Sequence, residues 1–252
     1  MFTGIGLLAF CFIFGAAMIG LFVGRKLPES HRTESTQKTV QNVMNVIGVL
    51  SALVLGLLVA STKTNYDTRS REVEQFAADL TLLDRELTHF DQGAKDLRDE
   101  LRAFTARKIA LTWPTERAVG PVMHDAQSIQ MLGDLQERLR MWLPRSEIER
   151  DGRTNALGLV AELQRTSRLL AVQDSSRTPR PFLIVVILWL SMLFFSYGVF
   201  APRNATAVIA MLICAFSVSI AANLIFDTDR PFSGFIRIPP TAMQQALDEM
   251  KP

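Results

Sequence analysis

Four apolar segments without a single Asp, Glu, Lys, Arg or His residue constrain this chain more than any other feature. They cover Gly4–Val23, Val43–Ala60, Phe182–Ala201 and Ala205–Phe226, and each holds roughly 18 to 22 residues. At about 1.5 Å per residue, a helix of that length crosses a hydrocarbon core of about 30 Å. Because lipid offers the backbone no hydrogen-bond partners, spanning segments must be helices or closed barrels. The sequence therefore predicts an all-α membrane protein with four transmembrane helices in two pairs.

The positions of these segments divide the chain into four parts. We predict a first transmembrane helix pair in residues 1–60, a cytoplasmic helical domain in 61–181, a second pair in 182–226 and a C-terminal cytoplasmic tail in 227–252. The helical domain carries 19 basic and 19 acidic residues, a balance typical of solvated helices and not of a nucleic-acid-binding surface. Lys and Arg near the span ends number nine on the side of the domain and both termini and five on the other. This excess predicts that the domain and both termini are cytoplasmic.

Apolar residues of the helical domain recur at alternating spacings of three and four. We call this set the heptad stripe; it comprises Val73, Phe76, Leu80, Leu83, Leu87, Phe90, Ala94, Leu97, Leu101 and Phe104. The pattern predicts a helix and favours coiled-coil packing. No proline interrupts the chain between Thr39 and Trp113, so we expect the second span to continue as one helix to Trp113–Pro114. Such a helix must pack against its own domain or against other copies, and we favour its own domain because two more helices follow.

The two following helices are each marked by an apolar face. We expect one from near Pro121 to Leu143–Pro144 and another from about Arg145 to Val172. The first face holds Ile129, Leu132, Leu135, Leu139 and Trp142, and the second holds Ile148, Leu157, Val160, Leu163, Leu169 and Leu170.

The residues that usually carry catalysis or bind metals are scattered. His31, His89 and His124 have no histidine partner at ligand spacing, and Cys11 and Cys214 both fall inside apolar spans. The sequence also lacks a glycine-rich phosphate loop and a nucleophile motif. We therefore expect no enzyme activity, no metal site and no cofactor.

The second span carries a face of small and polar residues that is a candidate pore lining. We call this face the small-residue stripe; it comprises Asn45, Gly48, Ala52, Gly56, Val59 and Lys63. Two interpretations stay open. A small-xxx-small series lets helices pack closely, whereas a passive pore needs only small, polar or apolar walls without ionisable groups. The similar series Ala16, Gly20 and Gly24 of the first span is interpreted as helix packing.

A distinctive motif follows the fourth span directly: Asp229-Arg230-Pro231-Phe232-Ser233-Gly234. An Asp–Arg pair, a proline-fixed turn and a glycine suit a loop that docks close to the membrane face. The other interpretation is a turn that leads back to an amphipathic tail helix over Thr241–Met250.

Several of these elements together resemble a known family. Leu27-Pro28 with His31, Tyr66 and Arg69, Trp113-Pro114 and the motif of residues 229–234 are similar to a bacterial membrane protein family that is described as bestrophin-like. The sequence departs from the family pattern in having Ser70 where a second arginine is expected. Bestrophins are anion channels, typically pentameric, with four spans, cytoplasmic termini and a pore lined by the second span. The resemblance implies a homo-oligomer of this kind in the lipid bilayer of a bacterial inner membrane, passing small anions such as chloride.

Two hypotheses from different classes follow. In the first, the protein is an oligomeric anion channel with Asn45 at the outer mouth, an apolar neck from Gly48 to Val59, and Lys63 with Arg69 attracting anions near the inner mouth. In the second, it is a non-conducting membrane scaffold or signalling protein that acts through its cytoplasmic helical domain.

Overall fold

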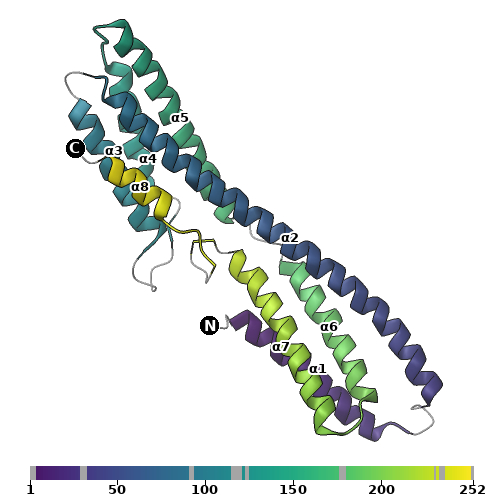
Figure 1. Cartoon of the computed structure of the whole chain (residues 1–252). Coiled ribbons are helices and arrows are strands. Elements are labelled where there is room, and N and C mark those ends of the chain that lie inside the picture. The colour runs from purple at the N-terminus through teal and green to yellow at the C-terminus, as the bar shows by residue number, and fades with distance from the viewer. Residues whose placement is uncertain are drawn as a thin grey trace. The chain divides into compact units, whose positions relative to one another are not determined.

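A computed structural model describes residues 4–28, 33–90, 94–114, 121–122, 125–175, 180–229, 231–232 and 236–250. Within these ranges all regular secondary structure is helical (Figure 1), which confirms the predicted all-α class. The helices are α1 (Gly4–Lys26), α2 (Glu34–Leu87), α3 (Ala94–Thr112), α4 (Ala126–Met141), α5 (Glu147–Ser175), α6 (Arg180–Phe200), α7 (Ala205–Thr228) and α8 (Thr241–Glu249).

The chain forms two compact units. The membrane unit comprises Met1–Asn65 and Thr178–Arg230, and the helical unit comprises Tyr66–Arg177 and Pro231–Pro252. Four of the described helices, α1, α2, α6 and α7, are long and apolar enough to cross a membrane. Their apolar stretches coincide with the four segments predicted from the sequence.

The core of the membrane unit forms where α1 packs against α6 and α7. Ile13 and Ala17 of α1 are fully buried and form an apolar cluster with Phe194 of α6 and Ala215 of α7. Figure 1 shows these three helices side by side. Apolar side chains alone do not hold helices together in lipid, so close van der Waals contact must contribute.

Glycines bring the backbones of α1 and α6 into contact. A methyl group added at Gly20 would lie 2.1 Å from the carbonyl oxygen of Phe195, and one added at Gly198 would lie 2.1 Å from that of Ala17. At Gly24 the corresponding distance to the Val199 oxygen is 2.3 Å. No side chain larger than hydrogen fits at these positions. The packing interpretation of the first-span glycines is therefore confirmed.

The heptad stripe forms the core of the helical unit. All of its described side chains are buried in one cluster: Val73, Phe76, Leu80, Leu83, Leu87, Phe90, Leu97, Leu101 and Phe104. They pack against apolar residues such as Leu135 of α4, Val160 of α5 and Met243 of α8. The stripe is thus covered within its own domain, as expected.

The prediction of one uninterrupted helix up to Trp113 is wrong. Helix α2 ends at Leu87, residues 88 and 89 form a turn, and α3 begins at Ala94. Phe76 of α2 and Phe104 of α3 approach with ring centroids 6.3 Å apart. The physical reason for the break is burial, because a straight helix cannot cover its own apolar stripe whereas two helices joined by a turn can.

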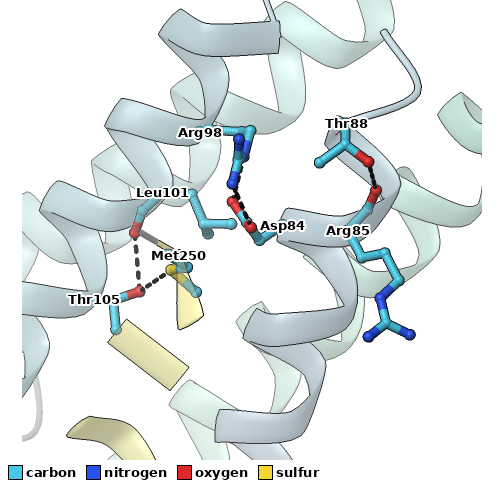
Figure 2. A network of polar contacts seen from close by, with 7 residues as sticks. All are labelled: Asp84, Arg85, Thr88, Arg98, Leu101, Thr105 and Met250. Carbon is cyan, nitrogen blue, oxygen red and sulfur yellow. Dashed lines mark hydrogen bonds and ion pairs between the residues drawn. The ribbon is translucent and has the colours of Figure 1, made fainter. Parts of the chain in front are cut away.

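Polar contacts also connect α2 to α3 inside the helical unit (Figure 2). The Arg98 guanidinium donates two hydrogen bonds to Asp84, from Nε to Oδ1 at 2.7 Å and from Nη2 to Oδ2 at 2.9 Å. Further along α3, the Thr105 hydroxyl donates to the Leu101 carbonyl at 2.9 Å and lies 3.9 Å from the Met250 sulfur. Met250, just after α8, is therefore packed against the middle of α3.

Two predicted apolar faces differ in part from the structure. The α4 face is buried at Leu132, Leu135 and Leu139, as expected, but Ile129 is 39% exposed. Ile129 lies beside a cavity between α3, α4 and α5 and not in closed packing, which accounts for its exposure. Helix α5 begins at Glu147; Ile148 in its first turn is 69% exposed, and Leu169, also predicted on the apolar face, is 43% exposed.

Candidate pore helix

The membrane portion of α2 has one face that packs within the chain. Leu58 is buried against Val186 of α6 and Ile225 of α7. Ser51 and Thr62, which are 1% and 2% exposed, lie on the same side of the helix. These residues are separated by four and seven positions, the spacing that places side chains on one helix face. The packed face therefore has a defined direction.

The hydroxyls on this packed face bond to the helix backbone. Ser51 Oγ donates to the Ile47 carbonyl at 2.7 Å, and Thr62 Oγ1 lies 3.0 Å from the Leu58 carbonyl oxygen. Both hydroxyls are thereby satisfied inside an apolar environment, where an unpaired hydroxyl costs free energy. They do not require water or a ligand.

The small-residue stripe lies beside the packed face and has two parts. At one end, Asn45 Oδ1 accepts a hydrogen bond of 3.2 Å from the Tyr197 hydroxyl of α6, and a methyl group at Gly48 would meet Leu193 at 2.9 Å. Further along, a methyl group at Gly56 would meet nothing within 4 Å. The first part is in contact with α6, whereas the second part is open.

The open part continues along the helix toward the charged residues. Ala52, Gly56 and Lys63 are exposed, and Val59 is 41% exposed. Arg69, expected beside Lys63 as a second basic group, has a side chain only 7% exposed. The isolated chain therefore leaves Lys63, and not Arg69, as the accessible cation of this pair.

A third face of α2 is bulky, apolar and exposed. Val46, Val49, Leu53 and Leu57 have exposed fractions of 60% or more. Only 11% of the most apolar stretch of α2 is buried, against 28% for each of the other three candidate spans. Helix α2 is therefore the span with the most surface left for lipid, water or other subunits.

The motif after the fourth span lies partly outside the described residues, which omit Arg230, Ser233 and Gly234. The Asp229 N–H caps α7 by donating to the Ile225 carbonyl at 3.2 Å. Inside the helical unit, Phe232 is 5% exposed and contacts Trp113 edge to face, with ring centroids 5.8 Å apart. This aromatic contact fixes the start of the tail.

Two hydrogen bonds complete the attachment of the tail. The Ile238 N–H donates to the Pro231 carbonyl at 2.7 Å, and Trp113 Nε1 donates to the Ile238 carbonyl at 2.8 Å. The tail then forms α8, close to the helix predicted over Thr241–Met250. The described part of the motif is thus a turn whose buried residues belong to the helical unit.

Among the described residues, no group of three or more His, Cys, Asp or Glu side chains could hold a metal ion. His89 is exposed, and His31 and His124 lie outside the described residues. Cys11 and Cys214 are exposed on α1 and α7 as free thiols.

Comparison with known proteins identifies the family. The sequence profile of the family described as Bestrophin-like domain matches residues 11–243. This chain belongs to the bestrophin-like family. The match covers nearly the whole chain and confirms the resemblance noted from Trp113-Pro114 and the motif of residues 229–234. A search of the curated proteins gives no match for this bestrophin-like protein.

Solved structures show the same fold. A bacterial bestrophin homologue from Klebsiella pneumoniae with a point mutation has a TM-score of 0.71 at 13% identity, over 99% of this chain and 98% of that one. A second point mutant gives 0.68 at 14% identity over 97% of each chain. The homologue structure solved by Zn-SAD phasing gives 0.64 at 13% identity, over 97% of this chain and 96% of that one.

Sequence reasoning missed the partner of one residue in the bestrophin-like chain. Tyr197 is the only tyrosine in the four apolar segments, and its hydroxyl bonds to Asn45. A tyrosine hydroxyl inside a span usually finds a hydrogen-bond partner. The presence of Tyr197 in the sequence therefore indicated that a polar partner lies on a neighbouring helix. Which polar residue it reaches depends on how α6 lies against α2, and sequence spacing does not determine that.

Proposed function

We propose that this bestrophin-like protein is an oligomeric membrane channel for small anions, with α2 lining the pore. Membership in the family supports this proposal, because bestrophins are anion channels. The observation that carries it for this chain is the open part of the small-residue stripe. Ala52, Gly56 and Val59 are exposed there, and no ionisable residue occurs between Lys38 and Lys63.

The three faces of α2 suit a subunit of a ring. The packed face contacts α6 and α7, the bulky face holding Leu53 and Leu57 suits contact with lipid or a neighbouring subunit, and the small-residue stripe suits the axis. Small and apolar walls allow a water-filled path that can close by dewetting. Lys63 would raise the local anion concentration at one mouth.

The proposed arrangement includes a pentamer in the bacterial inner membrane with both chain ends in the cytoplasm. In this orientation Asn45 lies toward the outer mouth and Lys63 toward the inner one. Proteolysis of the helical unit in inverted membrane vesicles, but not in right-side-out vesicles, is the expected result for this orientation.

Chloride flux into liposomes tests the conduction proposal. Purified protein should give flux above that of empty vesicles, and Gly56→Leu should reduce it by about tenfold or more because each subunit adds a side chain at the neck. Gly15→Leu on α1 is the matched control, since a methyl group at either glycine meets nothing within 4 Å. Its flux should equal that of the wild type.

Two results would remove the channel proposal. One is the absence of flux with folded wild-type protein, and the other is an equal effect of the two leucine substitutions. Native mass spectrometry distinguishes the channel from the scaffold hypothesis. A closed ring of five subunits has a central axis along which a pore can run, whereas a monomer has none.

The Lys63→Glu substitution tests the role of the basic residue at the inner mouth. It should lower the ratio of chloride flux to sodium flux.

A further inference from the structure

The helical unit contains a polar cavity that is separate from the pore helix. It has a volume of about 220 Å³ and lies between α3, α4 and α5. Its polar wall includes Lys108 from α3, Ser128 and Gln136 from α4, and Gln164, Ser167 and Arg168 from α5. Three consecutive helices thus direct hydrogen-bonding groups into one space.

Lys108 is the most constrained of these groups. Its residue is only 4% exposed, and its Nζ lies 3.5 Å from Ser167 Oγ. Burial lowers the pKa of Lys108, and the nearby carboxylate of Asp125 opposes this shift. A buried ammonium group is costly unless charged or polar groups compensate for the lost hydration.

Asp125, whose charge acts on Lys108, also has hydrogen-bond partners of its own. Asp125 Oδ2 accepts from Arg107 Nε at 2.8 Å and from the backbone N–H and hydroxyl of Ser128, each at 2.9 Å. The hydrogen bond from Arg107 holds the pKa of Asp125 far below its usual range, and those from Ser128 add to it. Asp125 is therefore ionised and serves as the N-cap of α4.

The charges that line the cavity are consequently unequal. Lys108 and Arg168 are basic and Asp125 is acidic, and the charge of Asp125 is shared with Arg107, a further cation beside the cavity. Arg168 is exposed and stands at the rim, where it can move toward an incoming ligand. Among the described residues that line it, the cavity thus has an excess of positive charge.

Size and neutral groups restrict the anion further. At about 30 Å³ per water, 220 Å³ holds roughly seven waters, far more than one chloride ion needs. The Gln164 side-chain amide donates to the Leu132 carbonyl at 3.4 Å and lies 3.3 Å from Gln136 Oε1, so the wall offers fixed hydrogen-bonding groups. Ile129 and Leu132 supply an apolar side.

We propose that this cavity binds a small organic carboxylate, with Lys108 and Arg168 holding the carboxylate and the glutamine and serine side chains contacting its body. The ligand class is set by the combination of two cations, neutral polar groups and an apolar wall in a space of this size. The site lies within the helical unit, and its occupancy does not depend on conduction through α2. Binding is therefore measured without flux, and the two proposals succeed or fail separately.

Isothermal titration of the full-length protein in detergent with succinate and with glutamate tests the site. At least one of them should bind saturably with a stoichiometry of one per chain. Arg168→Gln should weaken that binding by about tenfold, and Lys108→Met by more than tenfold, because each removes a charge-assisted hydrogen bond. Arg165→Gln is the matched control on the same helix and should leave the affinity unchanged, since Arg165 does not line the cavity.

If the buried Lys108→Met variant fails to fold, Arg168→Gln still tests the site, because Arg168 is exposed and its substitution leaves the core unchanged. The site is refuted if neither carboxylate binds, if Arg168→Gln and Arg165→Gln have the same affinity, or if folded Lys108→Met binds as tightly as the wild type. Saturable binding of inorganic phosphate without binding of either carboxylate would also overturn the proposed ligand class.

Discussion

Replacing Gly20 by alanine should disrupt the contact between α1 and α6. A methyl group at this position would lie 2.1 Å from the Phe195 carbonyl oxygen, whereas ordinary van der Waals contact begins at 3.4 Å. The two backbones must therefore separate by 3.4 − 2.1 = 1.3 Å at this point. No rotamer change relieves the clash, because both atoms are fixed by helical backbone.

The size of the effect follows from two opposing terms. Overpacking of a tight contact costs about 1–3 kcal/mol of unfolding free energy. Gly20→Ala should lie near the upper end of this range, because the Phe195 carbonyl oxygen belongs to helical backbone and cannot move aside as a side chain can. The higher helix propensity of alanine offsets about 1 kcal/mol of this cost. We expect a net loss of about 2 kcal/mol, which corresponds to a decrease in Tm of about 4–8 °C for a chain of this size.

Thermal unfolding in detergent, followed by tryptophan fluorescence, measures the difference. Gly15→Ala is the control, because it makes the same substitution on the same helix with nothing within 4 Å of the added methyl group. Gly198→Ala should resemble Gly20→Ala, and the double variant should lose less than the sum, since one separation of the helices accommodates both methyl groups. If Gly20→Ala and Gly15→Ala unfold within 1 °C of each other, the close contact does not exist as described.

Three further predictions concern the helical unit, and thermal unfolding measures each of them. Asp84→Ala should lower stability by about 2 kcal/mol, because it removes both hydrogen bonds from Arg98, whereas exposed Asp99→Ala should have little effect. Trp113→Phe should cost about 1 kcal/mol through loss of the 2.8 Å hydrogen bond to the Ile238 carbonyl while keeping an aromatic ring against the tail; unchanged stability would exclude a role for that bond. Asp125→Ala should cost about 1 kcal/mol at pH 7 through loss of the α4 N-cap. Because the pKa of Asp125 is lowered in the folded state, its contribution is present above about pH 4 and decreases as the pH falls further; a Tm difference between wild type and variant that stayed constant down to pH 3 would contradict this.

The four spans could be predicted from the sequence because lipid imposes one requirement on length and polarity. The limits of α7 differ from the predicted segment by two residues, Asp227 and Thr228. The burial of the heptad stripe was predictable for a similar reason, since helical spacing alone identifies the covered face. In both cases the physical constraint is local in sequence.

The turn after α2 was missed because the heptad spacing stays in step across it. Phe90 follows Leu87 by three residues, as it would in a continuous helix, and it is buried against Trp142 with ring centroids 5.3 Å apart. Gly93 was the one breaker in the sequence of this region. A single glycine in a sequence does not show whether the chain turns there or continues as a helix. The turn depends on the tertiary contact between Phe90 and Trp142, which the sequence does not reveal.

The candidate sites were predictable to different degrees. The small-residue stripe is visible in the sequence because its members share one helix face. Its division into a part in contact with α6 and an open part depends on the partner helix, as the Tyr197–Asn45 bond shows. The cavity could not be found, because Lys108 and Arg168 are sixty positions apart and only the packing of α3 against α4 and α5 brings them together.

The contact between α1 and α6 has a consequence for biogenesis. Gly20 and Gly198 are 178 positions apart, so at about 5–20 residues per second the ribosome needs roughly 10–35 s to supply the second helix after the first. During that time α1 must remain stable in lipid with its glycine face uncovered. The tail segment that covers Trp113 is synthesised later still. Insertion of the first span and completion of each unit are therefore separate events, and an inserted chain truncated before α6 would leave the glycine face of α1 without the helix that covers it.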